Sequence, residues 1–238
     1  PAGPARIRSV PTSSRPPATR IARAAPRGVV SEAGGSGDRD RRPLREIVRR
    51  PELLIAVGGA AVSYAAMVLV MTATPLAMVA CAFPIRDVAT VIQWHVLGMF
   101  VPSFFTGKLI RRFGTLRILL AGLALLGGHV VVAATGVEFL DFLSALMLLG
   151  VGWNFSYIAA TTLLTEVARP EERAKVQALN EFTVFALVAA ASLSSGWLFH
   201  RFDWRALNLS VLPLLLATGI LMLWLARRRD QRNSNAGQ

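Results

Sequence analysis

The chain has 238 residues, of which 53% are apolar and 17% are charged, and its mean hydropathy is +0.49. A soluble domain of this length carries about a quarter of charged residues, so this composition excludes an ordinary water-soluble globule and indicates a polytopic membrane protein. The single cysteine, Cys81, excludes a disulfide framework and a cysteine-based zinc site.

The net charge of +12 is divided unevenly along the chain. Residues 1–50 hold twelve arginines against four acids, whereas residues 51–238 hold fourteen basic residues against ten acids. Most of the excess lies in a leader, residues 1–42, which is rich in Pro, Gly, Ser and Arg and which we expect to be disordered. The leader has no aromatic groups to stack on bases, so we expect no nucleic-acid partner, and it lacks the apolar core of a signal peptide.

Residues 43–228 are predicted to form an all-α bundle that crosses a membrane six times. Each apolar run is long enough to cross a hydrocarbon core of about 30 Å as a helix. Residues 43–50 form a basic, amphipathic segment that suits a membrane surface, and residues 229–238 form a polar tail. The predicted transmembrane helices are 52–80, 88–110, 116–135, 139–167, 176–199 and 206–226.

The basic residues orient these six spans. Of the fourteen lysines and arginines after residue 50, eleven fall on the side of the hairpin 107–117 and the loop 169–175. The other three, Arg86, Arg201 and Arg205, fall on the opposite side. Because basic loops are retained inside, we expect a plasma (inner) membrane protein with both termini in the cytoplasm. Six spans also divide into three plus three, as in transporters built from inverted repeats.

Polar residues inside the second span are the first candidates for a substrate path, because polar groups are costly in hydrocarbon. Gln93 and His95 flank Trp94 in the outer half of this span. Two positions on a helix differ by about 200°, so both side chains cannot face one cavity. Either one of them lines a substrate path, or the three form an interfacial belt with Trp94 at headgroup depth.

Trp153, Asn154 and Tyr157 fall near the middle of the fourth span. Asn154 and Tyr157 are three residues apart and are expected to share a helix face. An amide and a phenol at this depth suit a hydrogen-bonding substrate, and a polar contact between helices is the alternative. Thr74, beside Pro75 in the first span, is a weaker candidate, because its hydroxyl can satisfy a backbone carbonyl at the bend expected there.

Charged residues gather at the predicted cytoplasmic ends of the spans. Carboxylates and guanidiniums at one membrane face can hold helix ends together in one conformation and separate in another. A solvated loop that only sets the topology is the alternative. The residues of this predicted gate are Arg111, Arg112, Glu166, Arg173 and Glu181.

Enzymatic functions find little support in this chain. No cluster of His, Cys and Asp has the spacing of metal ligands, and no Walker loop for ATP is present. Ser195 and His129 are the only loose candidates for an intramembrane serine protease, and both fall on the outer side of their spans. We therefore expect no enzymatic activity, no cofactor and no metal.

Three segments carry a resemblance to a known family. They are the hairpin Gly107-x-Leu109-x-x-Arg112-x-Gly114, the run 93–104 and the loop 169–177. From about residue 43 onward, the chain resembles the C-terminal half of a major facilitator superfamily transporter. The hairpin is similar to that family's cytoplasmic signature loop, with Arg111 at its acidic position and Thr115 at its basic one.

The resemblance implies a secondary active transporter for small molecules that works by alternating access in membrane lipid. It implies an ion gradient as driving force, with the proton favoured, and an N-terminal six-helix half that this chain lacks. The chain begins with Pro1 rather than Met, which agrees with a fragment or a processed product. The alternative function is a standalone six-span scaffold or regulatory protein without transport activity.

Overall fold

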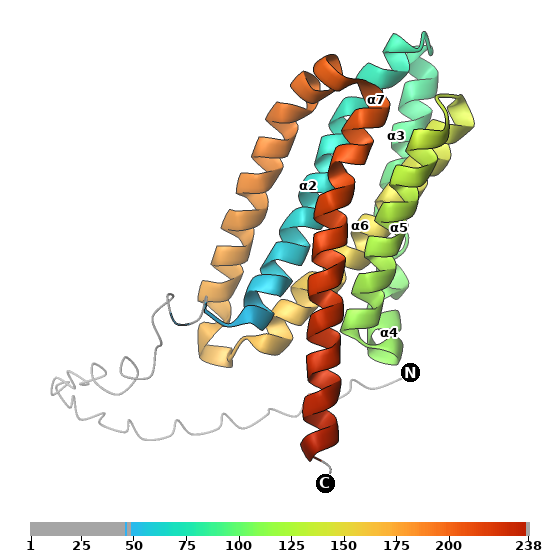
Figure 1. The fold of residues 1–238 in the computed structure, drawn as a ribbon. Helices are drawn as coiled ribbons and strands as arrows, with labels where there is room; N and C mark the ends of the chain where they lie inside the picture. The colour runs from blue at the N-terminus through green and yellow to red at the C-terminus, as the bar shows by residue number, and fades with distance from the viewer. Residues whose placement is uncertain (1–45, 47–48, 237–238) are drawn as a thin grey trace, which may run out of the picture. The chain divides into compact units, whose positions relative to one another are not determined.

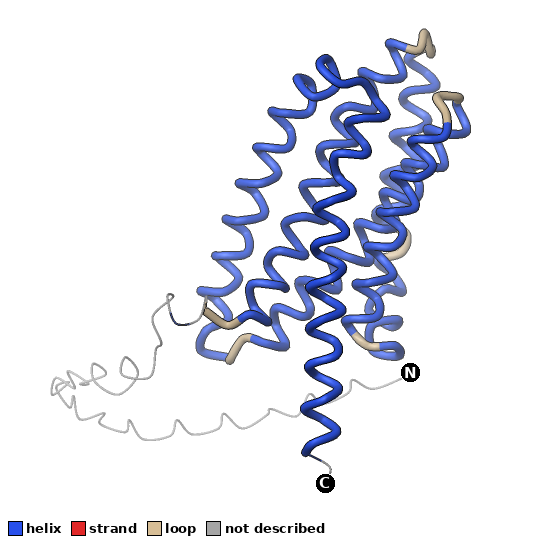
Figure 2. Tube along the Cα trace, in the orientation of Figure 1, coloured by secondary structure: helices blue, strands red, loops and turns tan. Residues whose placement is uncertain are grey.

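The computed structural model of the chain describes residue 46 and residues 49–236. The predicted leader, residues 1–42, lies outside the described residues, and so does most of the basic segment 43–50. The described part is helical and contains no strand (Figures 1 and 2). Its elements are α2 (Pro51–Ala80), α3 (Ile85–Phe100), α4 (Ser103–Phe113), α5 (Thr115–Thr135), α6 (Phe139–Val167), the short 3-10 helix η1 (Pro170–Glu172) and α7 (Arg173–Ala236).

Helices α2, α5 and α6 follow the apolar runs of the sequence closely. They begin and end within one residue of the predicted helices 52–80, 116–135 and 139–167. Helix α6 begins with a capping box. The Glu138 side chain accepts a hydrogen bond from the backbone N–H of Asp141, and the Asp141 side chain accepts one from the backbone N–H of Glu138. Such a cap satisfies donors that the first turn of a helix leaves without partners.

The predicted second helix, 88–110, is two helices in the structure. Helices α3 and α4 are bent by 41° at a break of two residues, Val101 and Pro102. Proline has no backbone N–H, so it cannot bond the carbonyl four residues before it, and the helix yields at that point. The two helices together are long and apolar enough for one span, whose backbone changes direction near the middle.

Helix α7 reverses direction at Asp203. This residue has φ 76° and ψ 178°, which are not helical angles, and the two arms of α7 run side by side with α2 (Figure 1). We call residues 173–202 the first arm and residues 204–236 the second arm. The Asp203 carboxylate accepts from the backbone N–H of Ala206 at 2.9 Å, which caps the second arm. The loop predicted at 200–205 is thus a one-residue reversal, and the described part of the tail predicted at 229–238 is helical.

Helix α2 packs against both arms of α7 and against α6. Ser195 of the first arm donates to the carbonyl of Leu69 at 2.8 Å. From the second arm, the methyl group of Met222 occupies the space where a side chain at Gly59 would lie. Helix α5 covers the other side of α6, and α3 also packs on α6. The core between them is apolar, with fully buried side chains such as Leu53, Met78, Leu119, Phe142 and Leu146.

Four helices of the described part, namely α2, α5, α6 and α7, are long and apolar enough to cross a membrane. The number is five if the bent pair α3–α4 is one span. This number takes α7 as a single helix although the chain reverses at Asp203. The helices therefore define a multi-pass membrane protein.

One end of the helix bundle carries most of its arginines. The α4–α5 connection, η1, the start of α2 and the end of α7 all lie at this end (Figure 1). Thr115 donates to Glu166, Arg229 lies 3.5 Å from Glu166, and Arg50 lies 3.3 Å from Glu172, so side-chain contacts join these segments. We call it the basic end, and its arginines include Arg111, Arg112, Arg117, Arg169, Arg173, Arg227, Arg228 and Arg229.

Candidate functional site

Three aromatic rings from α2 and α6 form a cluster near the middle of both helices. The ring centroids of Trp153 and Tyr157 are 5.3 Å apart and the rings are stacked, as residues four apart on one helix face allow. Tyr64 of α2 meets both rings edge-on, at 5.2 Å from Trp153 and 5.1 Å from Tyr157. The chain has only two tyrosines, and the fold brings them together. We call these three residues the aromatic cluster.

The indole of Trp153 is the group of this cluster whose hydrogen-bond donor is unsatisfied among the described residues. The residue is only 8% exposed, and its Nε1 has no hydrogen-bond partner among the described residues. Buried N–H groups in native proteins are almost always bonded, because an unpaired donor costs free energy. A ligand that has a flat apolar surface and an acceptor atom beside it would stack on the rings and accept a hydrogen bond from this N–H.

Glu181 of the first α7 arm lies within electrostatic reach of the Tyr157 hydroxyl. Its carboxylate accepts from Gln177 Nε2 at 2.6 Å and is half-buried. The neighbouring Asn180 is fully buried, and its Oδ1 has no partner among the described residues. Glu181, predicted as a member of the gate, has its printed hydrogen bonds within the first α7 arm, and in the described residues no ion pair joins it to an arginine.

The side chain of Asn154 contacts different helices from those that Tyr157 contacts. Its side-chain Nδ2 donates to the Met99 carbonyl at 2.7 Å and to Ser103 Oγ at 2.6 Å, while its Oδ1 accepts from Thr106 at 2.7 Å. These partners lie on both sides of the α3–α4 break. The shared face expected for Asn154 and Tyr157 is therefore not formed, because Asn154 binds α3 and α4 while Tyr157 contacts α2.

Gln93 and His95 diverge, as their separation on the helix requires. Gln93 is exposed, and so is much of Trp94. His95 is fully buried against α6, with Nδ1 2.8 Å from the Leu146 carbonyl. Its Nε2 has no partner among the described residues. Of the two, His95 is placed between helices and Gln93 on the outside of α3.

Thr74 makes a local contact. Its hydroxyl is buried and donates to the Val70 carbonyl of the same helix at 2.8 Å. This is the contact that the sequence allowed as the alternative to a role in the substrate path. Pro75 follows directly inside α2.

The signature hairpin turns at Gly114. This residue has φ +90°, a conformation that L side chains rarely adopt, and it ends α4 and precedes α5. Gly107, Arg111 and Arg112 are exposed, and the guanidinium of Arg112 lies 5.4 Å from the ring centre of Phe113. The hairpin thus turns sharply where glycine is needed and leaves its arginines at the surface.

The predicted gate is only partly assembled at the basic end. Glu166 joins the α5 start to the second α7 arm through Thr115 and Arg229. A cleft of about 590 Å³ lies between this junction and the hairpin, with Arg111 on its wall. Arg173 lies at the exposed start of α7, and no ion pair of Arg111, Arg112 or Arg173 is found in the described part of the chain.

Four residues that make contacts in the aromatic cluster or at the basic end were not among the site residues predicted from the sequence. Tyr64 could have been noticed as a lone aromatic in the small-residue half of α2, whereas its partners become known only from packing. Arg50, Glu172 and Arg229 were visible as charges, but nothing in their spacing predicts which charge pairs with which. The described residues hold no group of three or more His, Cys, Asp or Glu side chains that could bind a metal.

A helical, multi-pass bundle of this kind defines an integral membrane protein. A sequence model described as the Major Facilitator Superfamily matches residues 56–238. The chain therefore belongs to the Major Facilitator Superfamily.

Relatives with curated names agree with this family. The riboflavin transporter RfnT of Brucella anthropi is 45% identical over 174 residues, which cover 73% of this chain and 44% of the relative. The uncharacterised MFS-type transporter YddS of Bacillus subtilis is 34% identical over 70% of this chain and 38% of its own length. The 4-hydroxybenzoate transporter PcaK of Pseudomonas putida is 31% identical over 57% of this chain and 30% of its own length. The chain thus matches less than half the length of each relative.

Proposed function

We propose that this chain is the C-terminal six-helix half of a secondary transporter for small molecules that works by alternating access. Counting α3–α4 as one span and each arm of α7 as another gives six crossings. The share of RfnT that is matched, 44%, agrees with one of two halves. In such transporters two repeats enclose a site near the middle of the membrane and move against each other.

The aromatic cluster forms this half's wall of the substrate site, and a flat aromatic compound is its substrate. The observation that carries this proposal is the buried indole N–H of Trp153, which has no partner in the described part of the chain and lies next to two tyrosine rings. Riboflavin is the first substrate to test, because the transporter that is 45% identical bears that name. Asn154 and His95 position the helices around this wall, Thr74 only satisfies a carbonyl of its own helix, and Gln93 lies apart from the wall.

The basic end faces the cytoplasm of the cell, so both termini do as well. The arginines of the α4–α5 hairpin, the α6–α7 connection and the end of α7 support this orientation through the positive-inside rule. Glu181 is the proposed proton carrier of this half, because it is a half-buried carboxylate whose charge acts on Tyr157 of the aromatic cluster. Glu166, with Thr115 and Arg229, forms part of the gate on the cytoplasmic side, which its contacts to α5 and to the second α7 arm support.

Uptake of labelled riboflavin tests the proposal. The chain is expressed in a riboflavin-requiring bacterium together with the first half of RfnT, which supplies the opposite wall. We expect uptake only when both halves are present. Trp153→Phe keeps a ring and removes the N–H, so it should raise the KM for riboflavin by about tenfold, the value of one good hydrogen bond. Trp197→Phe, an exposed position on the first α7 arm, is the matched control and should leave KM unchanged.

A panel of solutes separates the two parts of the proposal. 4-Hydroxybenzoate and a non-aromatic sugar are tested beside riboflavin. Uptake of the sugar with no uptake of either aromatic solute would contradict the substrate class but keep the transporter. No uptake of any solute, with both halves inserted in the membrane, would contradict transport by this chain.

A further inference from the structure

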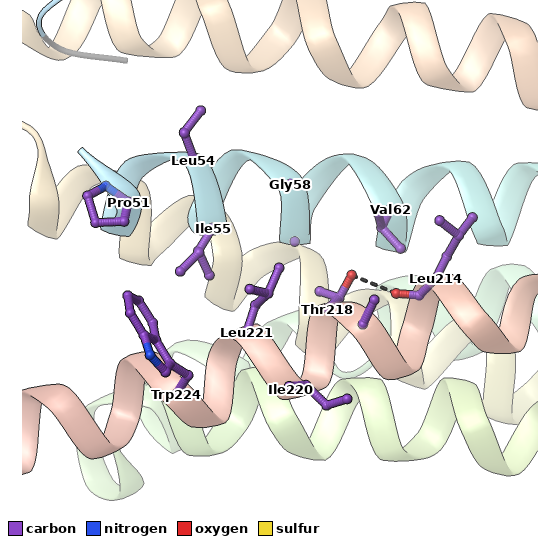
Figure 3. Close-up of a pocket in the computed structure, with 12 residues that line it drawn as sticks. Pro51, Leu54, Ile55, Gly58, Val62, Leu214, Thr218, Ile220, Leu221 and Trp224 are labelled. Atoms are coloured by element: carbon purple, nitrogen blue, oxygen red, sulfur yellow. Dashed lines mark hydrogen bonds between the residues drawn. The ribbon is translucent and has the colours of Figure 1, made fainter. Parts of the chain in front are cut away.

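An apolar groove runs between α2 and the second arm of α7, on the part of both helices nearest the basic end (Figure 3). Its volume is about 530 Å³. Its walls include Leu54, Ile55, Gly58, Val62, Leu221 and Trp224. The one hydroxyl on its wall, that of Thr218, is turned back to the Leu214 carbonyl of its own helix at 2.8 Å. The groove therefore suits a hydrocarbon chain.

The groove exists because of Gly58. A side chain at this position would meet no atom within 4 Å, whereas the space beside the next residue, Gly59, is filled by the methyl group of Met222. Helix α2 and the second α7 arm are thus in contact at Gly59 and leave a gap at Gly58. Figure 3 shows Ile55, Gly58 and Leu221 facing the gap from the two sides.

The groove opens outward from the bundle. Leu54, Leu214 and Leu221 on its rim are each about half exposed or more, and Ile220 is 65% exposed. Apolar side chains gathered in this way mark a surface that is covered by lipid or by another protein. Tyr64 and the rest of the aromatic cluster lie beyond the groove's walls, so the groove is separate from the proposed substrate site.

The end of the groove at Pro51 and Trp224, which we call its mouth, carries positive charge. Pro51 and Trp224 lie at the same end of the groove in Figure 3. The guanidinium carbon of Arg228 lies 3.9 Å from the ring centre of Trp224, and Arg227 and Arg228 are both exposed. Glu52, which follows Pro51 in the chain, is half-buried in the first turn of α2.

Two other arginines at this end already have carboxylate partners. Arg229 lies 3.5 Å from Glu166, and Arg50 lies 3.3 Å from Glu172. Arg228 instead rests on an aromatic face, where a guanidinium keeps its donors directed outward. Arg227 and Arg228 are therefore the groups at this end best placed to accept an anion.

We propose that the groove binds one anionic phospholipid from the leaflet at the basic end. An acyl chain lies along Gly58 between α2 and the second α7 arm, and the phosphate is held by Arg228 and Arg227 beside Trp224. A tryptophan and arginines at the end of an apolar stretch are the groups that anchor a helix at headgroup depth. The charge of the mouth selects an anionic headgroup over a zwitterionic one. The proposal does not depend on transport.

Quenching of tryptophan fluorescence by brominated lipids tests this site. The full chain is placed in nanodiscs of phosphatidylcholine that contain brominated phosphatidylglycerol or, in parallel, brominated phosphatidylcholine. The chain has five tryptophans, so the signal of Trp224 is taken as the difference between the wild type and Trp224→Phe. We expect Trp224 to be quenched at lower fractions of phosphatidylglycerol than of phosphatidylcholine.

Two variants test separately the contribution of the arginines at the mouth and that of the apolar groove. Replacing Arg227 and Arg228 by Gln should lower the preference for phosphatidylglycerol by about fivefold for each arginine. Gly58→Leu should fill the groove and reduce quenching of Trp224 by both lipids. Gly196→Leu, at another position with no atom within 4 Å, and Arg201→Gln, an arginine 6.0 Å from the ring of Phe202, are the matched controls and should change neither result.

Equal quenching by both lipids in the wild type would overturn the anionic selectivity and with it the proposal. Quenching that Gly58→Leu leaves unchanged would show that the lipid does not enter the groove. An unquenched Trp224 would mean that a protein covers this face, either a second copy or another subunit, which also overturns the proposal. Helix content and nanodisc incorporation, measured for every variant, distinguish these results from misfolding.

Discussion

Asn154 of α6 donates its side-chain amide to the backbone carbonyl of Met99, 2.7 Å away, at the point where α3 gives way to the break before α4. The same amide reaches Ser103 and Thr106 on the far side of that break. A proline break leaves backbone groups without helical partners, and a polar side chain from a neighbouring helix can satisfy them. Asn154 thus holds the bent second span at a defined angle.

Thr106→Val is predicted to destabilise this clamp. The change keeps the shape of the side chain but removes the hydroxyl that donates to Asn154, and the amide oxygen then stays buried without its donor. We expect the free energy of unfolding in detergent to fall by about 1–2 kcal/mol. Denaturant titration followed by circular dichroism measures it.

Thr162→Val is the matched control for this clamp. Its hydroxyl bonds the Ile158 carbonyl of its own helix, so no contact between helices is lost. Its free energy of unfolding should stay within error of the wild type. An equal loss in both variants would mean that the contact from Thr106 to Asn154 contributes nothing of its own.

Gly150→Ala is predicted to separate α3 from α6. A methyl group at Gly150 would lie 2.6 Å from the carbonyl oxygen of His95, a backbone atom that cannot move aside alone. Overpacking of this kind costs about 1–3 kcal/mol, which thermal unfolding in detergent would detect as a lower Tm. Gly127→Ala, where the added methyl meets nothing within 4 Å, should leave Tm unchanged. A Tm for Gly150→Ala equal to that of Gly127→Ala would contradict this close crossing.

The helices were predictable from the sequence, and their contacts were not. Long apolar runs place the ends of α2, α5 and α6 within a residue, because each run must be buried or face lipid along its whole length. The reversal at Asp203 was predicted as a loop of six residues, since polar residues flank it on both sides. Helical backbone continues through those polar residues up to the one that turns.

The candidate site was predictable only as far as single helices allow. Spacing correctly indicates that Gln93 and His95 diverge. It also groups Asn154 with Tyr157, yet Tyr157 stacks on Trp153 because Tyr64 of α2 lies there. That choice depends on which helix packs on which face. For the same reason Glu166 was expected in a gate with the hairpin arginines, and in the structure it contacts Arg229 from the far end of the chain.

Arg50→Gln is predicted to destabilise the start of α2. The Glu172 side chain is only 6% exposed and would keep its charge without the guanidinium 3.3 Å away. A buried charge without a partner is costly, so we expect a loss of about 1–3 kcal/mol in the free energy of unfolding. The double variant with Glu172→Gln should regain most of that loss, because the stranded charge is then gone.

Arg86→Gln is the control for this ion pair. Arg86 is 92% exposed and lies 3.9 Å from Asp87, so the pair is screened by solvent and its removal should have no measurable effect. If the double variant at positions 50 and 172 is as unstable as Arg50→Gln alone, the cost arises from lost packing of the arginine and not from the charge of Glu172.

Glu181→Gln is predicted to uncouple transport from the proton gradient. The change preserves the shape of the side chain beside Gln177 but removes a half-buried carboxylate whose charge acts on Tyr157. We expect exchange of labelled for unlabelled riboflavin to continue while accumulation against a gradient is lost, because exchange needs no net proton movement. Uptake with and without a protonophore measures both. Glu171→Gln, an exposed carboxylate of η1, should keep accumulation intact. Accumulation by Glu181→Gln that remains sensitive to the protonophore would place the proton carrier elsewhere.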